Sequence, residues 1–200
     1  MSELRTYRTV DLEDVSRSAA EALAARAAAE GLVDVAYAMT PSPFGDLVVA
    51  VTRRGLVRLA YPNEEPDAVL EELAARVSPR VLEVPGRLGP LRRQLDEYFA
   101  GHRTRFETPV DLSLVRGFTR EVLRATRRIP FGSVRTYRDV ATTAGSPNAY
   151  RAAGNALGSN PIPIVVPCHR VVHAGGGLGG YTGGLERKVH LLQLEGVLED

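Results

Sequence analysis

The chain has no tryptophan, two methionines and one cysteine among its 200 residues, and it has no long apolar run. Without about 20 consecutive apolar residues, the sequence excludes a membrane-spanning helix. A single cysteine cannot form an internal disulfide, which is typical of a reducing compartment. Structural zinc would need further cysteines, and the four histidines lack the spacing of metal ligands. Because the polar, acidic N-terminus is unlike a secretory signal, we expect a cytoplasmic protein without a metal or a cofactor.

The one cysteine, Cys168, lies in the segment Pro167-Cys-His-Arg-Val171, directly before His169. A thiolate is the strongest nucleophile among ordinary side chains, so Cys168 is a candidate reactive group; the alternative is a cysteine that fills an apolar gap. In an extended segment the two side chains would point to opposite sides, but Pro167 favours a bend and excludes a regular central strand. We expect the pKa of Cys168 to lie below the ordinary thiol value of about 8.5.

Two further features follow the cysteine. Glu195, at the end of the amphipathic segment Leu185–Leu194, is the best-placed carboxylate to orient His169. Seven of the ten residues in Gly175–Gly184 are glycine, without the spacing of a phosphate-binding P-loop. This composition leaves two interpretations, a flexible surface loop or a loop whose backbone closely approaches a flat ligand, with Tyr181 as a wall.

Residues 134–158 predict two short helices joined by a turn. Thr136 can cap a first helix through Ala144, and Gly145-Ser-Pro147 ends it, with Pro147 suited to the first turn of the next helix. Apolar residues with helical spacing then predict one packed face: Ala149, Ala152, Ala153, Ala156 and Leu157. The pattern indicates a helix-turn-helix. Its small side chains would allow close approach to a duplex but read few base edges, so we expect low sequence specificity.

The net charge of +1 conceals an asymmetry along the chain. Residues 116–190 contain eleven arginine or lysine residues and three acidic ones, a net charge of +8, so the remainder carries −7. Four of the basic residues would form a stripe on a helix: Arg116, Arg120, Arg124 and Arg127. A solvated helix face is one explanation. Beside a helix-turn-helix and a reactive cysteine, the stripe favours phosphate contact and salt-sensitive binding of nucleic acid.

Together these residues resemble the alkylguanine-DNA alkyltransferases, also called methylated-DNA–protein-cysteine methyltransferases. The resemblance is strong from Phe118 to Gly196, where separate motifs follow the family's order: Ile129-Pro-Phe-Gly132, Tyr137, Arg151-Ala-Ala-Gly154, Asn160-Pro161, Pro167-Cys-His-Arg-Val171, Gly180-Tyr-Thr-Gly-Gly184, Lys188 and Glu195-Gly196. In residues 35–110 it is weaker, with Ser42-Pro-Phe-Gly45 and Tyr98-Phe-Ala-Gly101 similar to the family's first hairpin and last N-terminal helix.

The resemblance implies direct reversal of DNA damage. Cys168 would take an alkyl group from O-6 of guanine as a stable thioether, so each molecule acts once; O-4 of thymine is left open as a second substrate. His169 would deprotonate Cys168 through a water, and Glu195 would orient His169. Tyr137 would displace the phosphate of the target nucleotide and donate to guanine, while Arg151 would fill the vacated stack.

The resemblance, the basic stripe and the small side chains of the second helix together assign roles to the remaining residues. Asn160 matches a hinge asparagine between the recognition helix and the cysteine segment. Ala152, Gly154, Arg116 and Arg120 are expected to contact DNA, and the substrate pocket is expected to contain Leu157, Val171, Tyr181, Thr182 and Lys188. The expected partner is double-stranded DNA with alkylated guanine, bound without sequence preference by a monomer; cooperative loading stays open.

The predicted fold is α+β. Residues 35–110 form a structural domain with a small antiparallel sheet and helices, ribonuclease H-like by resemblance, and residues 113–196 form a mainly helical catalytic, DNA-binding domain. The expected strands are Gly31–Tyr37, Leu47–Val51 and Leu56–Ala60, and the expected helices of the first domain are Leu70–Val77 and Leu91–Ala100. Residues 1–34 extend beyond the family core, with a helix at Val15–Glu30. Leu123 replaces the family's usual tryptophan, which predicts a repacked core.

Three other classes of protein are weighed against this prediction. A non-catalytic alkyltransferase-like protein would lack the reactive cysteine. A transcription factor would carry long polar side chains where Ala152-Ala-Gly154 stands. A Cys-His hydrolase would turn over repeatedly on an ester or a peptide.

Overall fold

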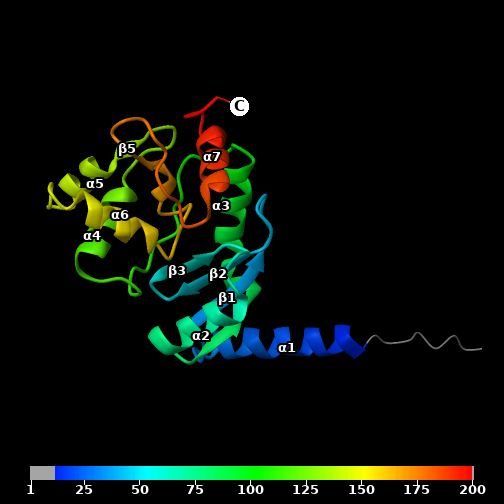
Figure 1. Ribbon diagram of the computed structural model, residues 1–200. Helices are drawn as coiled ribbons and strands as arrows, with labels where there is room; N and C mark the ends of the chain where they lie inside the picture. The colour runs from blue at the N-terminus through cyan, green and yellow to red at the C-terminus, as the bar shows by residue number, and fades with distance from the viewer. Residues whose placement is uncertain (1–11, 200) are drawn as a thin grey trace, which may run out of the picture.

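A four-stranded sheet with its helices and a cluster of short helices form the two halves of the protein, whose computed structural model describes residues 12–199 (Figure 1). The α+β class predicted from the sequence is confirmed. None of the helices in this range combines the length and the hydrophobicity that a bilayer crossing requires. The first eleven residues of the predicted N-terminal extension lie outside the described residues.

The sheet has the strand order β3-β2-β1-β4. Strands β1 (Val35–Thr40), β2 (Leu47–Thr52) and β3 (Gly55–Ala60) are antiparallel neighbours, as the sequence predicts. Strand β4 (Val81–Glu83) pairs parallel to β1, so the sheet is mixed at this edge. The sequence does not predict β4, because three partly exposed residues are too few for an alternating pattern.

Three helices accompany the sheet. Helix α2 (Pro66–Arg76) begins four residues before its predicted start, with Pro66 in its first turn, and η1 (Pro85–Leu88) leads into α3 (Gly89–Phe99). Helix α1 (Leu12–Ala29) runs past the edge of the domain (Figure 1). Ala24 is buried near its end, whereas Leu23 is exposed. The contact of α1 with the domain therefore involves its last turns.

The second half contains the helix-turn-helix. Its elements are α4 (Gly117–Thr126), β5 (Arg135–Thr136), α5 (Tyr137–Thr143), α6 (Tyr150–Gly158), η2 (Cys168–Arg170), β6 (Val171–Val172) and α7 (Leu185–Leu194). The predicted cap is confirmed, because the Thr136 and Asp139 side chains form a capping box at the start of α5. The placement of Pro147 is wrong: α6 begins at Tyr150, so the proline belongs to the turn.

Helix α6 packs on α4 through a narrower stripe than the sequence predicts. Ala153, Ala156 and Leu157 are buried, but Ala152 is exposed. Placing Ala152 on the packed face was wrong, because the buried stripe is only wide enough for Ala153, Ala156 and Leu157, and Ala152 lies at its margin. Its exposure leaves Ala152 free to face a partner.

The two halves are joined by a linker that pairs with β3. The N–H of Leu56 donates to the carbonyl of Pro109 at 2.8 Å, and the N–H of Asp111 donates to the carbonyl of Leu56 at 2.7 Å. Gly55 is needed beside this crossing, because its φ is +131° and an added Cβ would overlap the Pro109 carbonyl. The helical half is therefore attached to the sheet by backbone hydrogen bonds as well as by the covalent chain.

Leu123 on α4 gives a test of the core. This side chain is fully buried, so Leu123→Ala should lower the free energy of unfolding by about 2–5 kcal/mol, measured by urea denaturation. The matched control is Leu185→Ala, at a leucine that is 53% exposed, which should change it by less than about 0.5 kcal/mol. Equal effects of the two variants would contradict the buried position.

Candidate active site

The cysteine segment forms a tight turn. Residues Cys168–Arg170 make one turn of 3-10 helix, η2, and the N–H of Cys168 donates to the carbonyl of Val166 at 2.8 Å. This bend, predicted from Pro167, directs the buried side chains of Cys168 and His169 into the interior. Cys168 is 4% exposed and His169 is fully buried. In an extended segment these two neighbouring side chains would point to opposite sides. The turn allows both to face the interior.

Glu195, the residue after α7, lies at the centre of a buried hydrogen-bond network. Its Oε1 is 2.9 Å from Nε2 of His169, and Arg170 donates from Nε to Oε2 and from Nη2 to Oε1, both at 2.8 Å. A fourth donor comes from the other half of the protein, because the Tyr98 hydroxyl on α3 lies 2.6 Å from Oε1. A carboxylate can only accept, so Nε2 of His169 carries the hydrogen.

That assignment leaves the other ring nitrogen of His169, Nδ1, with a free lone pair. Within residues 12–199, Nδ1 is buried and has no hydrogen-bond partner. An unpartnered buried acceptor is uncommon in native proteins and indicates a functional group or a site for water. Burial lowers the pKa of His169, although Glu195 opposes this effect, so the imidazole is neutral and can accept a proton at Nδ1.

The charges in the network follow from its contacts. Burial alone would raise the pKa of Glu195, but the hydrogen bonds from His169 and Arg170 outweigh it and lower this pKa to about 2. Glu195 is therefore an anion throughout the physiological range. Because its folded-state pKa lies below that of an unfolded glutamate, the stability it contributes is present above about pH 4.5 and is lost as the pH falls towards 2.

The thiol of Cys168 departs from the sequence prediction. Burial raises its pKa to about 11, and this effect outweighs the hydrogen bond from Asn160 and the nearby ammonium of Lys188. The expected pKa below that of an ordinary thiol is wrong, because the turn removes Sγ from water. Cys168 is a neutral thiol at pH 7, so any attack by sulfur requires a base at the moment of reaction.

Asn160 fixes the position of this sulfur. Its Nδ2 donates to the carbonyl of Val166 at 2.9 Å and to Sγ of Cys168 at 3.0 Å, while its Oδ1 accepts from the N–H of Ile162 at 3.0 Å. All three contacts are buried. The side chain therefore braces the chain on both sides of the turn, and its donor would stabilise charge that develops on sulfur.

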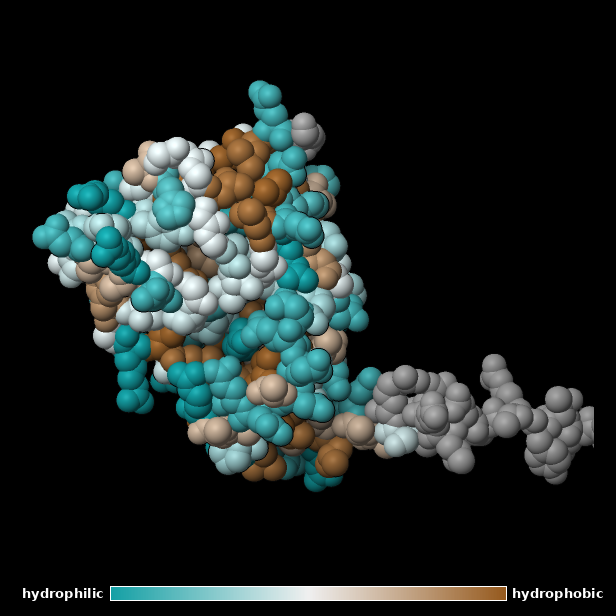
Figure 2. All heavy atoms as spheres, viewed as in Figure 1, coloured by the Kyte–Doolittle hydropathy of each residue, from teal (hydrophilic) through white to brown (hydrophobic). Residues whose placement is uncertain are grey.

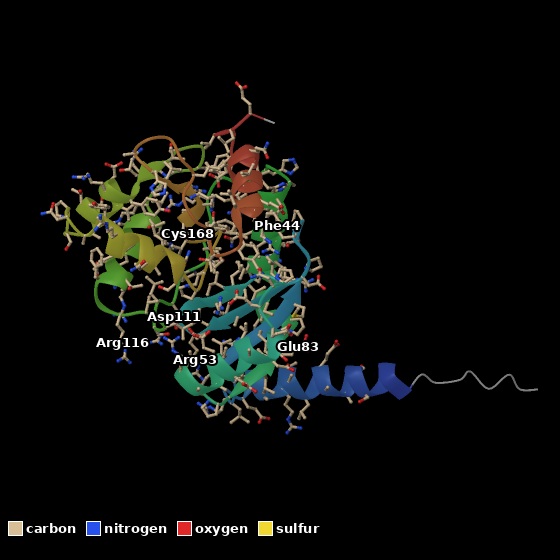
Figure 3. The ribbon with its side chains drawn as sticks, viewed as in Figure 1. Phe44, Arg53, Glu83, Asp111, Arg116 and Cys168 are labelled. Atoms are coloured by element: carbon tan, nitrogen blue, oxygen red, sulfur yellow. The ribbon has the colours of Figure 1, made fainter. Side chains whose placement is uncertain are left out.

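A cavity of about 760 Å³ opens above Cys168, between the helix-turn-helix and the glycine-rich loop. Figure 3 shows Cys168 within the helical half, away from its outer surface. Of the residues predicted from the sequence, the cavity is lined by Tyr137, Arg151, Gly154, Leu157, Cys168, Tyr181 and Thr182. Val171 and Lys188, also predicted as pocket residues, are fully buried and do not line it. The described part of the chain has no group of three or more His, Cys, Asp or Glu residues placed to hold a metal.

The glycine-rich loop is held closely against this cavity. Nζ of Lys188 donates to the carbonyls of Val171, at 2.6 Å, and Leu178, which ties the loop to the chain after the cysteine. Gly179 has a φ of +71°, and an added Cβ would overlap the hydroxyl of Tyr137. The backbone of the loop therefore packs directly against Tyr137, while its predicted approach to a flat ligand stays a prediction.

Tyr181 connects the loop to the sheet domain. Its hydroxyl lies 2.7 Å from that of Tyr61, which directly follows β3, and its ring meets the His169 ring edge-on at 6.3 Å. The hydroxyl of Thr182 donates to the carbonyl of Gly158 at the end of α6, at 3.0 Å. Both sides of the cavity are thus fixed by hydrogen bonds.

The start of α6 presents cations and an aromatic ring to solvent. Arg151 and Ala152 are exposed, and the guanidinium groups of Arg138 and Arg151 lie 5.3 and 5.8 Å from the ring centre of Tyr150. Hydrophilic residues project from this end of the helical half (Figure 2). Sequence analysis missed Tyr150, whose signal is an aromatic residue directly before the predicted Arg151. The surface suits stacking and phosphate contact.

Arg116 and Arg120 lie elsewhere. Arg116 precedes α4, and its side chain points away from Cys168 (Figure 3). Nη2 of Arg120 donates to the carbonyl of Val115 at 2.8 Å. Neither residue lines the cavity above Cys168. The four arginines of the predicted stripe line one surface of the protein, and this surface is separate from the helix-turn-helix surface.

The two halves match the two domain models of one family of DNA repair proteins. Residues 35–112 match the ribonuclease-like domain of 6-O-methylguanine DNA methyltransferase, and residues 117–197 match its DNA binding domain. The chain therefore belongs to the 6-O-methylguanine DNA methyltransferase family, and the resemblance stated from the sequence is confirmed.

Individual relatives give the extent of the similarity. The methylated-DNA–protein-cysteine methyltransferase of Mycolicibacterium paratuberculosis is 54% identical over 104 residues, which are 51% of this chain and 61% of that protein. The corresponding Sulfolobus acidocaldarius protein is 36% identical over 82% of this chain and 94% of its own length. A crystal structure of Mycobacterium tuberculosis OGT in complex with DNA is 37% identical, with a TM-score of 0.66 over 80% of this chain and 91% of that one.

Tyr98 is the contact with Glu195 that sequence analysis did not assign. It stands in the motif Tyr98-Phe-Ala-Gly101, but a sequence alone does not show that α3 meets Glu195, 97 residues later in the chain. Its hydroxyl gives the sheet domain, predicted to be purely structural, a direct contact with the network around His169.

Removing this hydroxyl tests the contact. In Tyr98→Phe one donor to Glu195 is lost, so the carboxylate becomes a stronger acceptor for His169 and raises the pKa of the imidazole. The low-pH limb of Cys168 alkylation by iodoacetamide should then move to higher pH, and the protein should lose about 1–3 kcal/mol of stability.

Tyr61→Phe is the matched control, because it removes a buried tyrosine hydroxyl that contacts Tyr181 and not Glu195. It should leave the pH profile in place. A Tyr98→Phe profile that coincides with wild type would show that Tyr98 has no influence on the His169 network.

Proposed function

We propose that this protein repairs DNA by transferring a methyl or other alkyl group from O-6 of guanine to Cys168, once per molecule, after the nucleotide has been flipped out of the duplex. The observation that carries this proposal is the network in which Glu195 holds His169, with Nδ1 free, beside a thiol under an open cavity. The similarity to the crystal structure of Mycobacterium tuberculosis OGT in complex with DNA supports DNA as the partner.

Proton transfer is the first requirement of the reaction. Because the thiol is neutral, a water between Sγ of Cys168 and Nδ1 of His169 would carry the proton to the imidazole as sulfur attacks. The imidazolium that forms is stabilised by the Glu195 carboxylate at 2.9 Å. In this order of events, no thiolate–imidazolium pair forms before the substrate is bound. A buried thiol favours this order, because burial disfavours the charged thiolate.

The transfer itself exchanges one bond for another. Sulfur forms a bond to the alkyl carbon as the bond from that carbon to O-6 of guanine breaks, and the electron pair of the broken bond stays on the guanine. Tyr137 lines the cavity and would donate a hydrogen bond or proton to the departing guanine. The thioether has no hydrolysable bond, so Cys168 is not regenerated.

Access to the base requires flipping. The alkylated atom is unreachable within a duplex, and extrusion costs a few kcal/mol, less for a poorly paired base. Helix α6 presents the exposed Ala152 and the half-buried Gly154 beside Arg151, so it can lie close to the duplex while Arg151 enters the vacated stack. The few polar side chains on this surface account for the expected lack of sequence preference.

Stoichiometry tests the proposed reaction. One mole of protein should remove at most about one mole of alkyl group from an O-6-methylguanine duplex, and intact-protein mass spectrometry should find the added alkyl mass on Cys168. Cys168→Ala should accept none while still binding the duplex. Repeated turnover without a mass gain would instead favour a Cys-His hydrolase.

The ratio of two rates tests flipping. Arg151→Ala should slow repair of the alkylated duplex but leave transfer from free O-6-benzylguanine close to wild type, because the free base needs no extrusion. Tyr137→Phe should slow both reactions, by about 1–3 kcal/mol in activation free energy. Arg135→Ala, at another exposed arginine of the helical half, serves as the control for lost charge. An unchanged ratio for Arg151→Ala would make Arg151 an ordinary surface residue.

A further inference from the structure

A second cavity, of about 1370 Å³, lies between α4 and the interdomain linker, and it shares no lining residue with the cavity above Cys168. Eight arginines and a single carboxylate, Asp111, line it. We name it the arginine groove; the arginines that matter for its chemistry are Arg105, Arg116, Arg120, Arg124, Arg127 and Arg128. The reaction proposed above uses none of them.

The arginine groove and the α6 surface lie on different sides of α4. Val122 and Leu123 are buried and belong to the core cluster that also contains the packed face of α6. Arg124, Arg127 and Arg128 are exposed and line the groove. One helix thus separates the two surfaces, and none of the groove arginines lines the cavity beside α6.

Most of this positive charge has no carboxylate partner. Asp111 pairs with Arg54 at 3.0 Å and Glu121 pairs with Arg124 at 2.8 Å. For five of the eight arginines, no ion pair is formed with the described residues: Arg105, Arg116, Arg120, Arg127 and Arg128. Like charges gathered without counterions repel each other, and a polyanion removes that repulsion.

Two of these guanidinium groups are held in position by the backbone. Arg120 donates to the carbonyl of Val115, and Arg127 donates to the carbonyl of Thr108 at 3.2 Å. Burial, and then the neighbouring charge of Arg105, lowers the pKa of Arg127. These two cations are therefore held in place before any ligand arrives, which reduces the ordering cost of binding.

The floor of the groove indicates what kind of polyanion fits. Half-buried aromatic rings, Phe106 and Phe131, line it together with Ile129 and Pro130. Inorganic phosphate would leave this apolar surface unused, and a duplex presents its bases stacked inside. A single strand offers phosphates and unstacked bases together, and a basic groove with aromatic side chains is the arrangement that binds such strands.

We propose that the arginine groove binds a second, single-stranded segment of nucleic acid, independently of the duplex on α6. Phosphates contact the five groove arginines that form no ion pair with the described residues, and bases lie against Phe106 and Phe131. The volume exceeds the roughly 300–1,000 Å³ of small-molecule pockets, as a chain of several nucleotides requires.

The test uses the full chain and a fluorescein-labelled oligothymidine, which contains no guanine and cannot serve as an alkyl donor. The triple variant Arg105→Glu, Arg116→Glu, Arg128→Glu should bind it at least tenfold more weakly than wild type in anisotropy titrations. For this variant, the slope of log K against log salt concentration should decrease in magnitude by about 2. Each phosphate contact on a single strand contributes about 0.7 to that slope, and three contacts are removed.

Controls separate this site from general charge and from folding. A second triple variant, Arg26→Glu, Arg80→Glu, Arg93→Glu, changes net charge equally on exposed positions outside the groove and should bind normally. If the first triple variant has a lower unfolding midpoint, the neutral set Arg105→Gln, Arg116→Gln, Arg128→Gln replaces it, with a weaker loss of binding expected.

Simultaneous occupancy decides the matter. Energy transfer between a labelled duplex and the labelled oligothymidine on one protein should appear with wild type and vanish with the first triple variant. Full competition between duplex and oligothymidine, or equal binding by both triple variants, overturns the proposal. Equal affinity for polyglutamate would also overturn it, in favour of a site for acidic peptides. None of these readouts requires alkyl transfer, so they stand apart from the test at Cys168.

Discussion

The structure depends on one buried anion. Glu195 is 4% exposed, and a carboxylate in such a position costs several kcal/mol unless it is paired and hydrogen-bonded. Four donor contacts meet this requirement, from Tyr98, His169 and twice from Arg170. Each donor is thereby fixed: α3 is held against the residue after α7, and the register of the cysteine turn is set by the two side chains that follow Cys168. The network that stabilises the fold also determines the tautomer of His169, with the hydrogen on Nε2.

Because the thiol of Cys168 is neutral, its reactivity depends on the groups that surround the sulfur. An exposed thiolate would react with many electrophiles, whereas a buried thiol with a pKa of about 11 reacts only when a base and a correctly placed carbon are both present. Asn160 and His169 approach the site from different segments, and neither is exposed. Selectivity thus comes from burial and geometry, and the cost is that proton transfer must accompany the attack.

Short-range patterns predicted more of this protein than long-range contacts did. The capping of α5 by Thr136, the bend at Pro167 and the strands β2 and β3 follow from local chemistry, and all are present. Ala152 was misplaced because alanine has little preference between core and surface. The pKa of Cys168 and the partner of Tyr98 depend on residues far away in sequence, whose meeting a single sequence does not encode in any local signal. The family resemblance supplied the expectation that His169 takes the proton of Cys168 through a water, which local patterns left open.

The Tyr98–Glu195 contact has a consequence for how such proteins can be recombined. The covalent boundary between the two halves lies in the linker near Pro109, but the boundary of the hydrogen-bond network does not, because one of its donors belongs to α3. A chimera that joins the helical half to a foreign sheet domain would inherit the cysteine turn intact and still leave Glu195 one donor short. A foreign sheet domain must therefore supply a hydroxyl donor at the position of Tyr98 for the buried carboxylate of its neighbour.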